Sequence, residues 1–379
     1  MNKKEIAVLR RSLTCDRNGI TALKGCYVSQ RKEIISCFDC SLVLMPEEEA
    51  EKYLSLLRRV LSGREGRNSF SVDFSIADVT GSEKHALLTR LRDSGLEDEE
   101  ALKAYYAAVI GSLKALESDC LILVACNTAD IMTRRADGRE DGESETSFRH
   151  LISCVCPVKD TKPVLGYDHG DGSFHTCPIE RVASAPDMGF VFPAFDDYAA
   201  NIYGALYYSR DTGDTHPDFT DAVFGKEAPT PADEMRGLFT SLLTDAVGDA
   251  CSYDVVQGVR EQIAEMVEDH KADKENPEPL TVSKLRMEAI LESSGVEEEK
   301  VAKFGVRFDE AFGQGTEVPP ENLVDIKKLE ITTPSAVVRV QADRGDLIQT
   351  RVIDGVKYIL IRADESVELN GLPLTIEEK

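Results

Sequence analysis

Apolar residues return every three or four positions in two early stretches of the chain, and this spacing predicts amphipathic helices. The first stretch follows Pro46 and runs from Tyr53 to Leu61. The second covers residues 97–116. Residues 121–124 are instead a short, fully apolar run, which is typical of a strand buried at the centre of a sheet.

Further apolar runs within the first 225 residues predict additional strands. They lie at residues 151–158, 190–192 and 205–208. Since helices and strands alternate without a repeat, residues 1–225 are expected to form one mixed α/β body, with a sheet and helices packed against it.

After Gly225 the helical spacing dominates, so residues 226–315 are expected to form a helical region. The four clearest stretches are residues 235–247, 253–270, 283–291 and 298–312. The chain then becomes rich in β-branched residues, and residues 316–379 are expected to form a small β-rich C-terminal domain.

The C-terminal region also carries a strong turn signal. Asp354 and Gly355 separate two apolar runs, and this dipeptide tolerates the positive φ angles that a two-residue hairpin turn requires. The predicted class is therefore α+β, with a mixed sheet and packed helices, a helical middle segment and a small β-rich end.

Composition narrows the classes of partner. The chain has 379 residues with 42% hydrophobic and 30% charged residues, which is a globular composition with room for more than one core. Its net charge of -24 opposes binding to nucleic acids and anionic membranes. Residues 1–64 carry a net charge of +4 and could meet an acidic partner or, less favourably, a nucleic acid; a solvated mixed surface is the simpler reading.

The sequence carries no targeting or membrane-spanning signal. Met1 and the lysines after it are not followed by the apolar segment of a signal peptide. The longest apolar run, Cys120 to Cys126, has seven residues, whereas a helix that spans a bilayer needs about 20. We therefore expect a cytoplasmic protein without membrane contact, in which the ten cysteines are free thiols.

The common catalytic motifs are missing. The sequence has no phosphate-binding P-loop, no dinucleotide-binding glycine motif, no zincin motif and no nucleophile elbow of the α/β-hydrolases. No cofactor is expected on this basis, and whether the protein is an enzyme stays open. The absence favours a non-catalytic binding or adaptor protein that works with an unknown protein partner or by self-association.

Cys154 and Cys156 are the best candidates for metal ligands. Residues two apart on a strand point to the same face, so both thiolates could converge with His175 and Cys177. Zinc favours four such ligands in a tetrahedron. The spacing matches no standard zinc module, and two buried structural cysteines are the alternative. For the function of the whole protein, the alternative to a binding protein is therefore a thiol- or metal-dependent enzyme with its site at these residues.

An aromatic segment is the other candidate site. Its rings and polar residues could line a ligand groove or anchor a partner, or they could pack into the core around a helix that covers residues 198–202. The candidates are Phe190, Phe192, Phe195, Asp196, Asp197, Asn201, Tyr207 and Tyr208.

The same segment resembles a known family. The residues that carry the resemblance are Gly189–Asp196 (GFVFPAFD), Tyr207-Tyr208, Met1–Glu5, Gly25–Val28, Cys156–Val158 and Val367–Gly371. Together they resemble a bacterial family known as domain of unknown function 4317, over essentially the full length of the chain. The resemblance implies an intracellular protein without an assigned activity, and it provides no catalytic residues.

Overall fold

The computed structural model of this chain divides into two compact units. Unit 1 comprises Met1–Ala232 and Pro277–Pro279, and unit 2 comprises Asp233–Asn276 and Leu280–Lys379. The structure describes residues 1–114, 117–133, 144–161, 163, 165–168, 170–176, 181–196, 199–248, 251–273, 279–326, 328–341, 343–363, 367–369 and 372–375.

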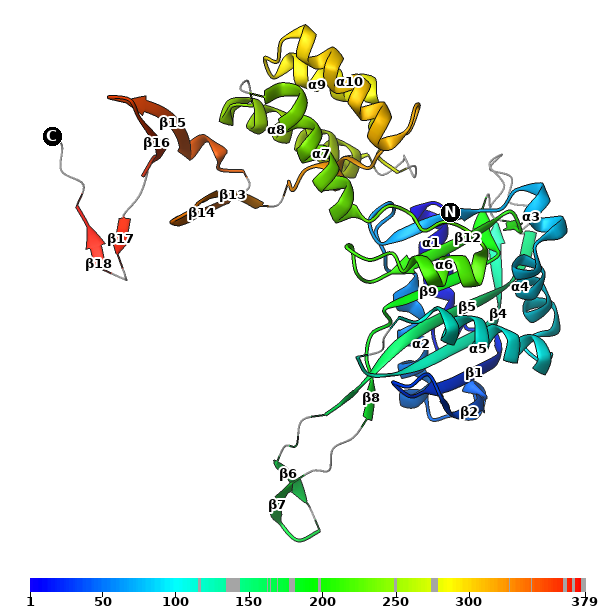
Figure 1. Cartoon of the computed structure of the whole chain (residues 1–379). Helices are drawn as coiled ribbons and strands as arrows, with labels where there is room; N and C mark the ends of the chain where they lie inside the picture. Colours follow the sequence, from blue (N-terminus) through cyan, green and yellow to red (C-terminus); the bar gives the residue numbers. More distant parts are fainter. Residues whose placement is uncertain are drawn as a thin grey trace. The chain divides into compact units, whose positions relative to one another are not determined.

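A large sheet forms the centre of unit 1 (Figure 1). Its described strands are β1 (Ile20–Val28), β2 (Ile34–Cys40), β3 (Ser69–Asp73), β4 (Asp119–Thr133), β5 (Ser144–Asp160), β8 (Arg181–Ala183), β9 (Met188–Phe192) and β12 (Gly204–Ser209). They follow the order β2-β1-β4-β5-β9-β12-β3, and β8 pairs with β5. The α+β class is confirmed, and each of these described pairings is antiparallel, so the sheet expected to be mixed is an antiparallel one.

Helices cover both faces of this sheet (Figure 1). One face packs against α1 (Lys3–Ser12) and α2 (Glu47–Val60). The other face packs against α4 (Glu83–Ser94), α5 (Glu99–Ser112) and α6 (Pro217–Phe224). The short helix α3 (Ile76–Gly81) precedes α4.

The position of strand β4 explains why residues 121–124 are all apolar and do not alternate with polar residues. Ile122 and Val124 join the core on the α5 side, whereas Leu123 and Ala125 join the core on the α2 side. Side chains alternate between the two faces of a strand, and here both faces are covered. A continuous apolar run is therefore required at residues 121–124, as the sequence predicts for a central strand.

Local capping sets the limits of the helices in unit 1. The side chain of Asp98 accepts a hydrogen bond from the backbone N–H of Ala101 at 3.0 Å and so begins α5. Glu47, Glu48 and Glu49 occupy the first turn of α2, where the helix dipole favours negative charge. Both predicted helices are therefore present, and α5 is shorter than the predicted range of 97–116.

Two small hairpins interrupt the second half of unit 1. They are formed by β6 (Leu165–Asp168) with β7 (Ser173–Thr176), and by β10 (Ala194–Asp196) with β11 (Ala199–Asn201). The helix considered over residues 198–202 is wrong, because Ala199–Asn201 is a strand. Its backbone groups pair with β10, which leaves them unavailable for helical hydrogen bonds.

A separate helical core forms the first part of unit 2. Its helices are α7 (Ala232–Val247), α8 (Tyr253–Ala272), α9 (Lys284–Ser293), α10 (Glu298–Phe312) and α11 (Pro320–Leu323). Ile263, Phe304 and Phe308 are fully buried at its centre. Ser252 and Ser283 cap α8 and α9 by accepting backbone hydrogen bonds from Val255 and Arg286. None of the helices in the described part of the chain is long and apolar enough to cross a membrane.

Three two-stranded hairpins follow the helices. They are β13 (Lys328–Thr333) with β14 (Ala336–Gln341), β15 (Ile348–Ile353) with β16 (Val356–Ile361), and β17 (Val367–Leu369) with β18 (Leu372–Leu374). The short 3₁₀-helix η3 (Gly345–Leu347) precedes β15. Asp354 has a φ of 49° and Gly355 a φ of 79°, so the hairpin turn predicted at this dipeptide is confirmed.

Candidate functional site

The aromatic segment lies in the core of unit 1. Phe190, Phe192, Phe195 and Tyr207 are 0% exposed, and Tyr208 is 5% exposed. The rings of Phe190, Phe192 and Tyr207 face α4, α5 and α6, whereas Phe195 and Tyr208 face α1 and α2. These rings therefore correspond to the core-packing alternative, and none of them is accessible to a ligand.

The polar candidates of this segment are spread apart from its rings. The side chain of Asp196 is 48% exposed, and its Oδ1 lies 4.0 Å from the N-terminal amino group of Met1. Asn201 donates a hydrogen bond from Nδ2 to Asp196 Oδ2 at 3.3 Å. Asp197 lies outside the described residues. These contacts describe a surface hairpin and do not form a cavity.

The proposed metal ligands are not brought together. Cys154 and Cys156 are both buried against the α2 side of the sheet, with their Sγ atoms 3.7 Å apart. His175 is exposed on the β6–β7 hairpin, where Ser173 and Asp171 bind its Nε2. Cys177 lies outside the described residues. Among the residues that the structure describes, no group of three or more His, Cys, Asp or Glu side chains is placed to hold a metal ion.

The environment of Cys154 also disfavours a nucleophilic thiolate. Its hydrogen bond with Cys156 and its burial both raise the pKa of the Cys154 thiol well above its ordinary value. A reactive cysteine requires the opposite, namely a lowered pKa and access to solvent. The two residues are therefore suited to filling the core beside Ile152 and Leu123.

Cysteine labelling tests this placement. We expect iodoacetamide to alkylate the exposed Cys37 and Cys251 at least about a thousandfold faster than Cys154 and Cys156, because the buried thiols require the unit to open. Peptide mass spectrometry of the native chain over time measures each rate. In guanidinium chloride the four rates should converge. Equal rates in the native chain would show that Cys154 is accessible and would contradict the placement.

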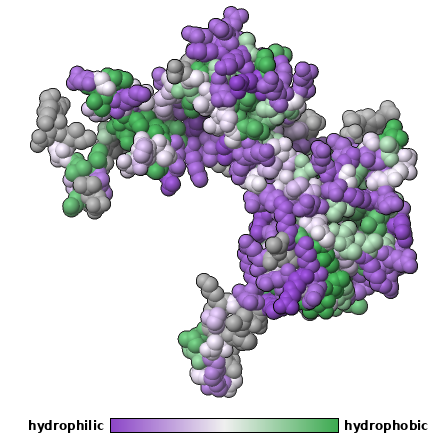
Figure 2. All heavy atoms as spheres, in the orientation of Figure 1, coloured by the Kyte–Doolittle hydropathy of each residue, from purple (hydrophilic) through white to green (hydrophobic). Residues whose placement is uncertain are grey.

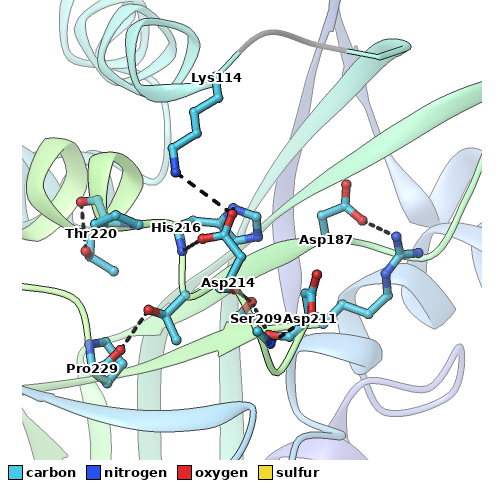
Figure 3. Close-up of polar contacts among 12 residues, drawn as sticks. Lys114, Asp187, Ser209, Asp211, Asp214, His216, Thr220 and Pro229 are labelled. Carbon is cyan, nitrogen blue, oxygen red and sulfur yellow. Dashed lines mark hydrogen bonds and ion pairs between the residues drawn. The ribbon is translucent and has the colours of Figure 1, made fainter. Parts of the chain in front are cut away.

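An open pocket of about 410 Å³ lies at one end of the sheet of unit 1. Its walls include the starts of β4 and β9, the ends of β5 and β12, the residues after α5 and the first turn of α6. Because neighbouring antiparallel strands run in opposite directions, these strand starts and strand ends meet at the same edge of the sheet. Figure 3 shows Lys114, Asp214 and His216 pointing toward one another at this edge, with Asp187 nearby.

The loop from Arg210 to His216 forms one wall and is anchored by buried groups. Ser209 Oγ donates to the backbone oxygens of Asp214 at 2.7 Å and of Asp211 at 3.1 Å. Thr215 Oγ1 donates to the backbone oxygen of Pro229 at 2.7 Å (Figure 3). Because Ser209 and Thr215 are buried, these bonds hold the loop in one conformation before any ligand arrives.

His216 occupies an unusual backbone position in this loop. Its φ of 49° and ψ of 66° lie in the left-handed region, which costs energy for a residue with a side chain. The residue is the N-cap of α6, and the carboxylate of Asp214 accepts a hydrogen bond from its backbone N–H at 2.8 Å. Its Nδ1 lies 3.6 Å from Asp214 Oδ2. Its Nε2 is buried and has no hydrogen-bond partner among the described residues.

Asp187 is a partly buried carboxylate in the pocket wall. Burial raises the pKa of Asp187, and the positive charges of Arg210 and Lys159 oppose this effect. Arg210 Nη2 lies 2.5 Å from Asp187 Oδ1, and this charge-assisted contact favours the ionised carboxylate. Asp187 and Arg210 therefore form an ion pair in the wall of the pocket.

The pocket as a whole carries more negative than positive charge. Its lining contains the carboxylates of Glu117, Asp119, Asp187, Asp211, Asp214 and Asp218 against the cations Lys114, Lys159 and Arg210. With His216 neutral, the lining carries a net charge of -3.

Sequence reasoning did not single out these residues. Asp187 directly precedes a buried strand, and residues 210–216 directly follow one. Polar residues at the ends of buried strands are a known signal for functional loops, and Arg210-Asp-Thr-Gly-Asp-Thr-His216 carries it. The signal was weak because such loops occur at every edge of a sheet.

Comparisons with known proteins identify the family of this chain but give it no activity. A family model with the description "Domain of unknown function (DUF4317)" matches residues 1–372. The family resemblance drawn from the sequence is thereby confirmed. No curated protein matches the chain.

Proposed function

Because this chain belongs to the family described as Domain of unknown function (DUF4317), whose description names no activity, we propose a function from its geometry. The protein is a non-catalytic binding protein that holds a small organic cation, such as a di- or polyamine, in the pocket of unit 1. We place this binding in the cytoplasm, which is the location expected from the sequence. The single observation that carries it is an acidic pocket with carboxylates left unpaired.

The dimensions of the pocket support a small ligand. Pockets that bind small molecules have volumes of about 300–1,000 Å³, and this one measures about 410 Å³. Leu113, Val155 and Phe219 line part of it and offer apolar contact to the methylene groups of an alkylamine.

The ion pairs among the pocket residues indicate whether the ligand should be positively or negatively charged. Arg210 is occupied by Asp187 at 2.5 Å, and Arg181 lies 2.9 Å from Asp119. Lys114 Nζ lies 4.0 Å from Asp214 Oδ2. Within the described residues, the side chains of Glu117, Asp211 and Asp218 form no ion pair, and the charge of Lys159 acts on the Asp187 carboxylate. The excess carboxylates favour a ligand with two or more positive charges.

His216 adds an acceptor for such a ligand. In the neutral tautomer that carries its proton on Nδ1, which lies 3.6 Å from Asp214 Oδ2, the lone pair of Nε2 is available to an N–H donor. This nitrogen is buried and has no hydrogen-bond partner in the described part of the chain. An ammonium group could satisfy it while neutralising the nearby carboxylates.

The experiment is a calorimetric titration of the chain with spermidine at about 150 mM NaCl, which screens non-specific attraction to the acidic surface. Replacing Asp211 and Asp218 together by asparagine should weaken binding by roughly 100-fold or more, because each of the two charge-assisted hydrogen bonds contributes about 1.5–3 kcal/mol. Succinate, a dianion of similar size to the diamine putrescine, should not bind.

The matched control is Asp16→Asn, which removes an exposed carboxylate outside the pocket. It should leave the affinity for spermidine unchanged. Equal loss in the control and the double variant would show that the amine binds the overall acidic surface. Binding of succinate in place of spermidine would reverse the proposed charge of the ligand, and the absence of binding by either would exclude this role for the pocket.

A further inference from the structure

The C-terminal hairpins of unit 2 expose a set of large apolar side chains. We call this set the C-terminal apolar surface, and it consists of Val337, Val352, Ile353, Val356, Tyr358, Ile359, Ile361, Leu372 and Leu374. Val352 is 67% exposed and Leu372 is 69% exposed. Figure 2 shows hydrophobic side chains at the surface of these hairpins. Exposed apolar residues scattered singly are normal, but a set of nine along consecutive hairpins indicates an interaction surface.

The register of the hairpins places apolar side chains on shared faces. In β15–β16, Ile348 pairs with Ile361 and Thr350 pairs with Ile359, so Ile348, Ile359 and Ile361 lie on one face with Val352. In β13–β14, Leu329 pairs with Val340 and Ile331 with Val338 on one face. The opposite face of β13–β14 contains the ion pair between Glu330 and Arg339. In β15–β16, Ile353, Val356 and Tyr358 lie on the opposite face, so both faces of this hairpin carry large apolar side chains.

The hairpins also lack the pairing that would make them stable. Each of the three is a two-stranded sheet in the described structure, so the outer side of both strands is an edge. An isolated two-stranded hairpin is marginally stable in water, and its unpaired edges favour the addition of another strand.

The base of β15–β16 is buried within the described part of unit 2. Ile348 is 4% exposed, and the Tyr253 hydroxyl of α8 donates to the backbone oxygen of Gly345 at 2.9 Å just before the strand begins. Four residues farther along, Val352 is exposed. The hairpin is therefore anchored at its open end and uncovered toward its turn at Asp354-Gly355.

Charge identifies what can cover this surface. Residues 328–375 contain six Lys and Arg and seven Asp and Glu, a net charge of -1, whereas the rest of the chain carries -23. The charges near the hairpins are paired locally, with Arg339 2.7 Å from Glu330 and Arg362 2.8 Å from Asp346. A strongly charged partner finds no complementary excess here. Two acidic copies of this chain, however, repel each other least at this near-neutral region.

We propose that the C-terminal apolar surface is the interface of a homodimer, formed when the hairpins of two copies pair their edges and bury their apolar faces. The inference is independent of the ligand in unit 1. A two-fold interface uses the same patch on both copies, and two identical near-neutral apolar hairpins meet this requirement. The association also completes the sheets that each chain leaves open.

Sedimentation equilibrium of the full chain tests the proposal. The expected mass is twice the 41.8 kDa of one chain. Replacing Val352 and Ile361 together by lysine should weaken the dimer roughly tenfold or more, because the new charges must be desolvated at the interface. High salt should preserve or strengthen the wild-type dimer, since it screens the repulsion between acidic copies.

Gln314→Lys is the matched control, because it adds a lysine at an exposed position of unit 2 that lies outside the C-terminal apolar surface. This variant should remain dimeric, and circular dichroism should show the same helix content in all variants. A wild-type chain that stays monomeric at high concentration would overturn the proposal, as would a double variant that dimerises like the wild type. Hydrogen-exchange protection of β15–β16 in a monomer would show instead that the chain covers its own hairpins.

Discussion

Replacing Phe190 by alanine is expected to lower the free energy of unfolding of unit 1 by about 3–5 kcal/mol. The ring is fully buried and lies 5.3 Å from the ring of Phe224 and 6.2 Å from that of Tyr105, measured between centroids. Truncation removes this apolar contact and leaves a cavity that the covered sheet cannot collapse to fill. Because the chain has no tryptophan, urea unfolding followed by tyrosine fluorescence and circular dichroism is the suitable measurement.

The control for this change is Tyr203→Ala in the turn before β12. Tyr203 is 46% exposed, so the loss of its ring should cost less than about 1 kcal/mol. The comparison separates the two roles considered for the aromatic segment. A core residue changes the unfolding midpoint, whereas a residue that lines a groove changes binding with little effect on stability. An unchanged midpoint for Phe190→Ala would contradict the packing described for this segment.

Acidification from pH 6.5 toward pH 4 is expected to destabilise unit 1 through His150, which is 0% exposed in the core on the α1 and α2 side of the sheet. Burial lowers the pKa of His150 from 6.5 to about 4. Asn127 Nδ2 donates to Nε2 at 3.4 Å, and Nδ1 donates to the backbone oxygen of Phe148 at 3.3 Å. Both ring nitrogens are thus used by the neutral form, and a second proton on Nε2 would face the Asn127 donor.

The direction of the pH effect follows from proton binding. Between pH 6.5 and 4 the unfolded chain binds a proton at His150 that the folded chain does not, so the free energy of unfolding falls as the pH falls. The full difference corresponds to about 3 kcal/mol. Asp98 and Asp119, whose pKa values are lowered by hydrogen bonds, lose their contribution only below their ordinary value of 3.8. Asp187, whose pKa is raised by burial, acts in the opposite direction.

His150→Gln isolates this contribution. Whatever the stability of the variant at neutral pH, its free energy of unfolding should change less between pH 6.5 and 4.5 than that of the wild type. His175→Gln on the exposed β6–β7 hairpin should leave the wild-type pH dependence in place. Urea unfolding at several pH values gives both slopes. Equal slopes for the wild type and His150→Gln would show that His150 is not the buried neutral group.

Helices and turns that are set by residues close together in the sequence could be predicted from the sequence. The Asp354-Gly355 turn requires positive φ angles that these residues tolerate, and the structure has them. The spacing of apolar residues in α8 and α10 and the serine caps of α8 and α9 also act within a few residues. The length of β5 was underestimated, because its pairing with β4 continues beyond the apolar run of residues 151–158.

The candidate site depends on distances that the sequence does not contain. Residues 114, 187 and 216 meet because antiparallel pairing brings the starts and ends of β4, β5, β9 and β12 to one edge. The same topology decides which face each side chain of β5 occupies, and it buries Cys154 and Cys156 while His175 stays exposed. The types of these residues can be read from the sequence, but the sequence does not show which of them lie close together in space.

By itself the sequence determined the chain's acidity, its α+β class, its helices and the turn of β15–β16, because composition and short-range periodicity set these properties. The tertiary structure alone decided that the rings of the aromatic segment pack in the core, that an acidic pocket forms beside β9 and β12, and that the C-terminal hairpins expose large apolar side chains. Each of these depends on which distant residues pack together, and local sequence preferences carry little of that information.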